Sequence, residues 1–353
     1  MSLSRPVRFP LLKLPWLCIE PVVKSWDIFD IIFFALISRR TRQIVKYLKI
    51  PLNEIKIFLS ELKYIRLNSS FKKWYFRDES EKESSFEYYF RYTDLKNYSL
   101  VLQKNAIPLY TNRTNDDITS YTDGNEISAL KMAMEFLNEV FKCSVEAVNI
   151  DADNFPESGN IGVRSTTNLL ITKQGSQSLG YAQSQKLSLL LKNLEVTGIC
   201  TIMRNTENDF YVDPKLFKCK TLIFWPHSAA WVTREILLQI EVAQLSFYRC
   251  QFSVEDILSF VTKWARSDNK KLEILLMCIR STRISLENFQ TEELNPIPLS
   301  GKPRIPPSES LARFDFSKGL EIVRQDGLVA TIHIEGGYFL FYVWNNQPAI
   351  TQH

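Results

Sequence analysis

A chain of 353 residues is too long for one small core, and roughly 150 residues per domain predicts two or three domains. Hydrophobic residues make up 45% and charged residues 23%, which excludes a fully disordered, collagen-like or coiled-coil chain. The net charge of +4 is uneven: residues 1–50 contain nine basic and three acidic residues, a local +6 that leaves −2 for the rest. This basic segment predicts docking to something acidic, which is a nucleic acid, a membrane surface or an acidic protein.

The cysteine and histidine content argues against disulfides and metal sites. Six cysteines are scattered without a CxxC pair, which predicts reduced and mostly buried thiols. The three histidines lie far from any cysteine pair, so no zinc site is expected. The sequence has neither a P-loop nor a Gly-rich dinucleotide-binding motif, and no nucleophile-elbow or zinc-protease motif. We therefore predict no catalytic, cofactor-binding or metal-binding residues and no enzymatic activity.

No segment is expected to cross a membrane. The longest apolar run, residues 31–37, is seven residues long, against about 20 that span a bilayer. Prolines and charged residues interrupt the apolar stretch at the N-terminus, which argues against a signal peptide. The basic cluster 38–42 is short and the rest of the chain is slightly acidic, so nucleic-acid binding is not expected either. These features predict a cytoplasmic or nuclear protein.

The first 50 residues predict three or four short helices. Prolines, Pro21 among them, permit no more than short helical turns at the front. From Ile28 apolar residues recur at helical spacing, with Asp27 as N-cap. The stretch 38–48 has an apolar and a basic face, made of Ile44, Val45 and Leu48 and of Arg39, Arg42, Lys46 and Lys49. Such helices are too small to be stable alone. They form either a cap on a larger domain or a docking motif that a partner completes.

Residues 51–125 predict a β-rich segment. Aromatic and β-branched residues concentrate in four strand-like pieces, 55–59, 64–68, 73–76 and 86–92. Residues 126–142 predict the clearest helix of the chain, with Asn125 as a cap. Its apolar residues recur every three or four positions: Leu130, Met134, Leu137 and Phe141. A strand over 144–151 follows.

Strand-like and helix-like pieces then alternate up to residue 278. The strands are 198–204, 220–225, 244–250 and 272–278, and the helices are 232–240 and 253–267, with Ser253 as N-cap of the second. Leu222, Leu245 and Leu272 are 23 and 27 residues apart, within the period of leucine-rich repeats. The asparagine-containing signature of those repeats is absent. An irregular leucine-rich-repeat-like domain and a simple α/β layer are therefore favoured equally.

Residues 293–310 are rich in proline and predict a long loop. Residues 311–353 predict β-strands, joined by hairpin turns at 325–327 and 335–337. The predicted fold class is thus α+β or α/β. A helical module (1–50) precedes a β-rich segment (51–125), a strand–helix domain (126–292), a Pro-rich loop (293–310) and C-terminal strands (311–353).

A set of residues near the N-terminus follows a specific spacing: a Leu-Pro start, an apolar residue eight positions after the Leu, an Asp-apolar pair and a Ser-basic-basic close. Its members are Leu14, Pro15, Val22, Trp26, Asp30, Ile31, Leu36, Ser38, Arg39, Arg40, Ile44 and Val45. This set resembles the F-box, the short helical motif of receptors in SCF-type ubiquitin ligases. The opening residues 9–15 look like those of nematode F-box families. Two positions differ, since Leu17 stands where many F-boxes have Glu and Trp26 replaces a smaller aliphatic residue.

The body of the chain is similar to the F-box associated domain, type 2. In residues 230–277 a Trp-led helix precedes a strand, then a capped helix with Phe260 and Trp264, then a Ser-Asp-Asn turn into a strand. Residues 319–332 and 341–344 resemble the end of the same domain.

The resemblance implies a receptor that does no chemistry itself. The F-box would bind the SCF adaptor subunit, and through it a cullin, while the α/β domain would hold a protein substrate. Adaptor-binding residues would be Leu14, Pro15, Val22, Trp26, Asp30, Ile31, Leu36, Arg39, Arg40 and Ile44. The receptor would accelerate ubiquitin transfer by holding a substrate lysine near the ubiquitin thioester. The alternative is a solenoid-like protein-binding scaffold that is not coupled to a ubiquitin ligase.

Overall fold

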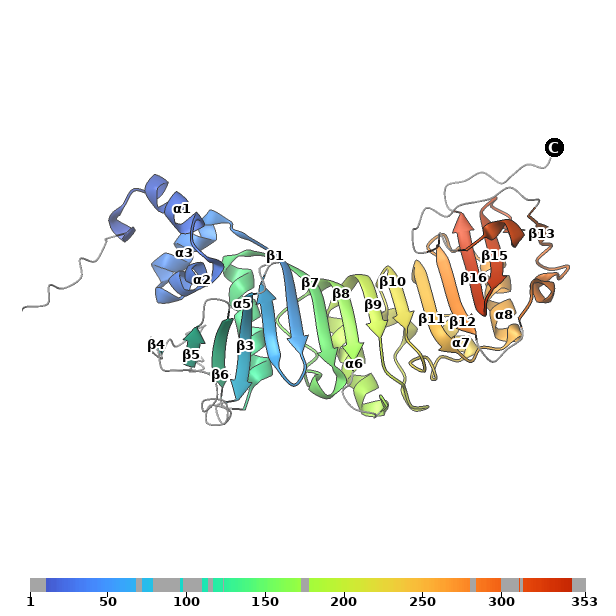
Figure 1. Cartoon of the computed structure of the whole chain (residues 1–353), viewed down its shortest axis with the longest axis horizontal. Helices are drawn as coiled ribbons and strands as arrows, with labels where there is room; N and C mark the ends of the chain where they lie inside the picture. Colours follow the sequence, from blue (N-terminus) through green and yellow to red (C-terminus); the bar gives the residue numbers. More distant parts are fainter. Residues whose placement is uncertain are drawn as a thin grey trace, which may run out of the picture. The chain divides into compact units, whose positions relative to one another are not determined.

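The computed structural model confirms a mixed α/β fold, in which helices accompany a large sheet (Figure 1). The chain folds into two compact units. Unit 1 comprises 1–56, 62–145 and 161–163, and unit 2 comprises 57–61, 146–160 and 164–353. The residues that the structure describes are 11–67, 72–78, 96–97, 110–113, 117–122, 124–172, 178–279, 284–299, 311 and 314–344.

Unit 1 begins with a 3-10 turn (Leu11–Lys13) and the helices α1 (Trp16–Lys24), α2 (Ile28–Ile37) and α3 (Arg39–Leu48). The predicted cap of α2 is confirmed, because the backbone N–H of Phe29 donates to Asp27 Oδ1 at 2.9 Å. Ser38 caps α3 in the same way, accepting from the N–H of Thr41 at 3.2 Å. The expectation of no more than short turns is wrong for α1, which contains Pro21. This proline removes one backbone hydrogen bond, to the carbonyl of Leu17, and the helix still continues to Lys24.

The rest of unit 1 is a sheet with one long helix. Strands β1 (Pro51–Leu59), β2 (Lys63–Leu67) and β3 (Lys72–Asp78) confirm three of the predicted strands, whereas 86–92 lies outside the described residues. The strand order is β1-β2-β3-β6-β5-β4, completed by β6 (Asp117–Thr122), β5 (Tyr110–Arg113) and β4 (Lys96–Asn97). Helix α5 (Glu126–Val140) packs on β2 and β3, and its predicted cap Asn125 accepts from the N–H of Ser128.

The helical pattern of residues 38–48 predicted a basic face that includes Arg42. In the structure Arg42 instead contacts another helix. Its guanidinium lies over the ring of Phe136, 5.4 Å from the centroid, and 3.9 Å from Glu139 Oε2. Both partners belong to α5, so Arg42 holds α3 to α5, while Arg39 and the two lysines are exposed. Helical periodicity cannot detect this contact, because it depends on a helix nearly 90 residues further along the chain.

Unit 2 is built on parallel strands that follow one another in chain order. They are β7 (Lys142–Asp151), β8 (Ser165–Thr172), β9 (Glu195–Ile202), β10 (Thr221–Phe224), β11 (Gln244–Cys250) and β12 (Ile274–Ile279). Their register places one row of fully buried residues across the sheet: Val148, Leu169, Cys200, Leu222, Leu245 and Leu275. Leu222 and Leu245, which the sequence places 23 residues apart, are paired in neighbouring strands. The partner of Leu245 in β12 is Leu275, so Leu272 does not continue this row.

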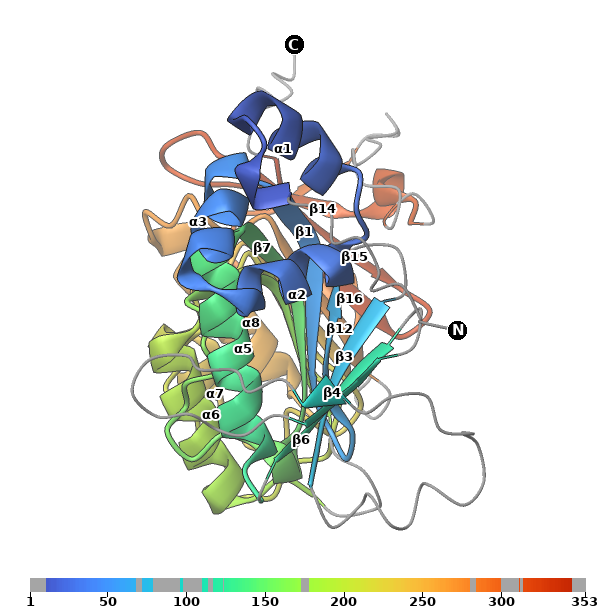
Figure 2. The same ribbon diagram turned by 90° about the vertical axis from the view of Figure 1, so that its left-hand side faces the viewer.

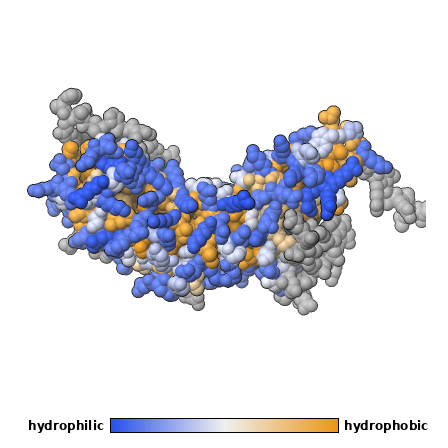
Figure 3. All heavy atoms as spheres, turned by 180° about the vertical axis from the view of Figure 1, so that it is seen from behind, coloured by the Kyte–Doolittle hydropathy of each residue, from blue (hydrophilic) through white to orange (hydrophobic). Residues whose placement is uncertain are grey.

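Helices α6 (Tyr181–Asn193), α7 (Arg234–Leu237) and α8 (Val254–Arg266) connect these strands and lie on one side of them (Figure 2). Seen from behind, hydrophilic residues cover much of the surface, with apolar patches between them (Figure 3). Ser253 caps α8 as predicted, and its backbone N–H donates back to Asp256 Oδ2 at 2.9 Å. Shorter 3-10 turns occur at Ala152–Asn154, Pro214–Leu216, Leu286–Phe289 and Phe316–Lys318.

The C-terminal strands complete unit 2. β16 (Tyr338–Trp344) pairs antiparallel with β12, and β15 (Val329–Glu335), β14 (Leu320–Val323) and β13 (Ile297–Pro298) follow outward. Both predicted hairpin turns are confirmed, with Gly327 and Gly337 at φ +82° and +81°. The predicted Pro-rich loop contains β13, while 300–310 lie outside the described residues.

The C-terminal strands are covered on both faces, unlike the parallel strands before them. A cluster that includes Phe316, Leu340 and Trp344 packs on the face of β16 opposite to Phe341, whose ring contacts Trp264 of α8. Over β9 and β10 the corresponding side is open, since Ile199, Met203 and Trp225 are 41%, 38% and 42% exposed. A large partner could therefore reach this open side of the sheet directly.

Candidate functional site

The residues predicted to bind the adaptor differ in exposure. Pro15, Val22, Arg39 and Arg40 are exposed, Leu14, Trp26, Asp30 and Leu36 are half-buried, and Ile31 and Ile44 are buried. Ile31 is 3% and Ile44 is 8% exposed, so these two side chains stabilise the helices rather than offer a surface. Their role in docking stays a prediction.

A different set of apolar side chains is exposed on the same helices. This N-terminal apolar set consists of Trp16, Leu17, Val22, Ile37 and Tyr47, which are 41%, 81%, 36%, 67% and 73% exposed. The rings of Trp16 and Tyr47 meet edge to face, with centroids 6.2 Å apart, so α1 and α3 share part of this surface. Apart from Val22, sequence reasoning missed these residues. Helical spacing shows which residues are apolar, but α2 is apolar on nearly all sides, and the pattern does not tell which side stays uncovered.

In unit 2 a row of side chains crosses the ends of β9, β10 and β11 on the open side. The backbone N–H of Met203 donates to the carbonyl of Ile171, and that of Trp225 donates to Ile202, so both residues continue the parallel register beyond their strands. The ring of Trp225 stacks on that of Tyr248, with centroids 5.3 Å apart and an interplanar angle of 22°. An exposed stacked aromatic pair offers a large rigid apolar contact area.

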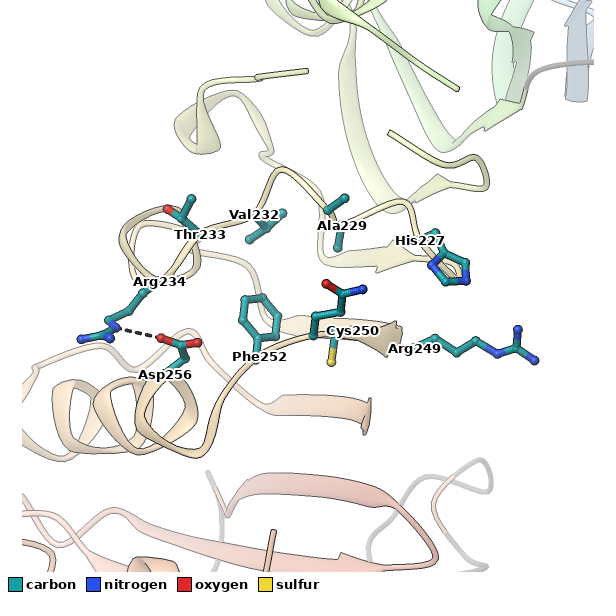
Figure 4. A pocket seen from close by; sticks show the side chains of 11 residues that line it. His227, Ala229, Val232, Thr233, Arg234, Arg249, Cys250, Phe252 and Asp256 are labelled. Carbon is teal, nitrogen blue, oxygen red and sulfur yellow. Dashed lines mark hydrogen bonds and ion pairs between the residues drawn. The ribbon is translucent and has the colours of Figure 1, made fainter. Parts of the chain in front are cut away.

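Beside this pair, the C-terminal ends of β10 and β11 enclose a cavity of about 210 Å³ (Figure 4). His227, Arg234, Arg249, Phe252 and Asp256 are among its lining residues. In Figure 4, Arg234 and Asp256 meet at one end, and the side chains of His227 and Arg249 extend from the other. Ligands of open parallel sheets commonly bind at this edge, beyond the carboxyl ends of the strands.

The backbone at this cavity is strained in two neighbouring strand ends. His227 and Arg249 adopt left-handed conformations, with φ of +64° and +56°. Each such residue that is not glycine costs on the order of 1–3 kcal/mol and is common at functional sites. The pairing register between β11 and β12 also shifts between Tyr248 and Cys250, so Arg249 occupies a bulge that redirects its side chain. Sequence reasoning missed both residues, because neither strand pattern nor composition indicates a left-handed residue.

The charges lining the cavity are not balanced. Arg234 Nε donates to Asp256 Oδ1 at 2.8 Å. Burial raises the pKa of Asp256, but hydrogen bonds from Arg234 and Ser253 outweigh it and lower that pKa below the ordinary value. This pair is therefore ionised, and its two charges neutralise each other. Arg249 remains as the cation at the other end of the cavity. Burial also raises the pKa of the lining Cys250 to about 12, so its thiol is protonated and no nucleophile at neutral pH.

Two further kinds of site are absent from the described residues. No three or more His, Cys, Asp or Glu side chains in this part of the chain are arranged to hold a metal ion. Within the same residues, no helix combines the length and the apolar character needed to cross a bilayer.

Comparisons with known proteins support the predicted family. Residues 215–277 match the family model described as F-box associated, and this segment contains β10, α7, β11, α8 and all the lining residues of the cavity. One uncharacterized protein of Caenorhabditis elegans is 32% identical over 108 residues, which are 30% of this chain and 25% of that protein. A second is 30% identical over 140 residues, 39% of this chain and 32% of the relative. The chain thus matches a quarter to a third of these relatives' length. No solved structure matches it.

The fold and the matched segment define a mixed α/β protein with an F-box associated domain. The resemblance to nematode proteins with an F-box associated domain, predicted from the sequence, is confirmed by this matched segment and by the two relatives.

Proposed function

We propose that this chain is the substrate-recognition subunit of an SCF-type ubiquitin ligase. Helices α1–α3 would form the F-box that binds the small adaptor subunit, and through it a cullin, and unit 2 would bind a protein substrate. The observation that carries the proposal is the N-terminal apolar set in a chain whose residues 215–277 match the F-box associated family. Large apolar side chains that gather in water commonly mark a protein interface.

In this role the chain would act by positioning its substrate and not by catalysing a reaction. The chain would contribute no catalytic residue; it would hold a substrate lysine near the ubiquitin thioester carried by other subunits, and so raise its effective concentration. We place this activity in the cytosol or the nucleus, where the thiols of the chain stay reduced. Membranes, nucleic acids and cofactors have no part in it.

The adaptor interface would combine apolar anchors with a basic margin. Leu17 projects furthest into solvent, and Trp16 and Tyr47 present aromatic edges beside it. Arg39 and Arg40 are exposed at the start of α3, and complement an acidic partner. A specific interface buries about 1,600 Å² in total, and a few central apolar residues carry most of the binding energy.

The test is adaptor binding by the purified full chain with the substitution Leu17→Asp. Because Leu17 is exposed, the variant should fold normally, yet bind recombinant adaptor at least about tenfold more weakly. The matched control is Tyr181→Asp, an exposed residue of α6 in unit 2, which should bind like the wild type. Ile31→Asp is unsuitable, because it would bury a charge. Equal binding by wild type and Leu17→Asp would contradict the assignment of this surface.

One observation favours the alternative, a protein-binding scaffold that engages no ligase. That hypothesis expects N-terminal apolar residues to pack into the body, and Ile31 is buried while Arg42 and Lys72 join α3 and α2 to the rest of unit 1. Val22 and Leu17 are exposed, which favours the receptor. Failure of the wild-type chain to bind any adaptor paralogue would select the scaffold.

A further inference from the structure

We propose that unit 2 recognises its substrate at the cavity formed by His227 and Arg249 and at the stacked Trp225–Tyr248 pair beside it. The occupant is a protein segment that presents a large apolar side chain next to an aspartate or glutamate. This inference rests on the proposed function in one respect, that unit 2 receives a protein substrate.

The apolar half of the recognition surface is already assembled. Trp225 and Tyr248 stack at 5.3 Å, and Met203 on the neighbouring strand extends the same row. Because the rings of Trp225 and Tyr248 are already stacked on each other, little of their side-chain freedom is lost when a partner covers them. An apolar side chain of the substrate would lie against the exposed ring of Trp225.

The preference for an acidic residue in the substrate follows from the charges that line the cavity. Among the lining residues that the structure describes, the carboxylate of Asp256 is engaged by Arg234. Arg249 is exposed at the opposite end, directly after Tyr248 in sequence, and His227 follows Trp225 by two residues. A substrate carboxylate there would accept charge-assisted hydrogen bonds from Arg249. A basic segment would be repelled.

The strained backbone ties the two halves together. A left-handed residue in the bulge directly after Tyr248 turns the chain, so that Arg249 is exposed instead of alternating to the buried side of the sheet. Glycine would adopt this conformation without strain. An arginine at this position therefore carries a cost in stability that a purely structural role does not require.

The experiment selects ligands from a displayed library of random dodecapeptides with the purified full chain. The wild type should enrich peptides with Asp or Glu next to Leu, Phe or Trp. Selection with Arg249→Glu should enrich Lys or Arg in place of the acidic residue. Trp225→Ala should lose the apolar preference and keep the acidic one. The controls Arg164→Glu and Tyr181→Ala, both exposed elsewhere in unit 2, should select the wild-type motif.

A synthetic peptide from that selection then separates binding from folding. Arg249→Gly should bind it at least about tenfold more weakly, and melt at the same or a higher temperature, because glycine relieves the left-handed strain. Loss of binding in a variant that is no less stable is not expected from a structural role.

Three results would overturn the inference: no acidic enrichment with the wild type, the same motif with Arg249→Glu, or much tighter binding when phosphoserine replaces the acidic residue. The last would assign the site to a phosphorylated segment. Adaptor binding is measured on the same samples. If the wild-type chain binds adaptor but selects no acidic peptide, the inference is refuted and the proposed function stands. If the wild-type chain does not bind adaptor, the proposed function is refuted.

Discussion

The guanidinium of Arg324 lies over the indole ring of Trp264, with its central carbon 5.0 Å from the ring centroid. It also donates to both carboxylate oxygens of Asp326, at 2.9 and 2.7 Å, and to the carbonyl of Asn269 at 2.7 Å. One buried side chain thus connects the hairpin turn after β14, the turn after α8 and the helix itself. The C-terminal strands and α8 are consequently expected to unfold together.

Replacing Trp264 tests this connection. The ring is 3% exposed and packs edge to face on Phe341, with centroids 5.0 Å apart, so it belongs to the core. Trp264→Ala should lower the free energy of unfolding by about 3–5 kcal/mol. Urea denaturation measures this loss. The control is the exposed Tyr181 of α6, whose substitution by Ala should change stability by no more than about 0.5 kcal/mol. Similar losses for both variants would contradict the packing.

Asp326 makes the stability of this region depend on pH. Hydrogen bonds from Arg324 lower the pKa of its carboxyl far below the ordinary value of about 3.9. The unfolded chain therefore takes up this proton at a higher pH than the folded chain does. The stabilisation is fully present above the ordinary pKa and is lost as the pH falls toward the folded one.

Asp326→Asn should consequently lower the melting temperature at neutral pH and flatten its fall between about pH 5 and pH 2. Asp268→Asn, at an exposed neighbouring turn, should leave the profile unchanged. Calorimetric scans across this range check the prediction. Parallel profiles for wild type and Asp326→Asn would show that the carboxylate does not couple to folding.

The local parts of this structure could be predicted from the sequence and the long-range parts could not. Asp27, Asn125 and Ser253 cap their helices as expected, because a cap depends on the three or four residues that follow it. Arg42 could not be placed, since its partners lie on α5. The candidate site was missed for the same reason. His227 and Arg249 come together only when β10 and β11 pair, and their left-handed backbone has no sequence signature.

The cysteines offer a measurement of exposure in solution. Cys18 is exposed on α1, whereas burial raises the pKa of Cys143 and of Cys250 to about 12. With a pKa near 12, about one thiol in ten thousand is ionised at pH 8. Iodoacetamide should therefore modify Cys18 first, as read by peptide mass spectrometry. Bound adaptor should slow that reaction, because Cys18 adjoins Leu17. Early labelling of Cys250 would show that the end of β11 opens.

Electrostatic steering by the N-terminal helices should involve Arg39 and Arg40 and exclude Arg42. The double substitution of Arg39 and Arg40 by Gln should slow adaptor association and flatten its salt dependence, since such charges are screened over about 10 Å at 0.1 M salt. Dissociation should change little, because the apolar set controls it. Surface plasmon resonance at two salt concentrations measures both rates. Arg42→Gln should instead destabilise unit 1. Identical association rates at low salt would rule out steering.

The order of the parallel strands has a consequence for the growing chain. Each strand from β8 to β12 can join the sheet as soon as it leaves the ribosome, because its partner has been made just before it. The edge of β12, an apolar run from Ile274 to Ile279, stays unpaired until β16 has been made, and β16 follows β13, β14 and β15 in the chain. A product that stops before residue 338 would display this edge and offer it to strands of other molecules. Such fragments should aggregate during translation, because only chains that extend through Trp344 contain the strand that covers this edge.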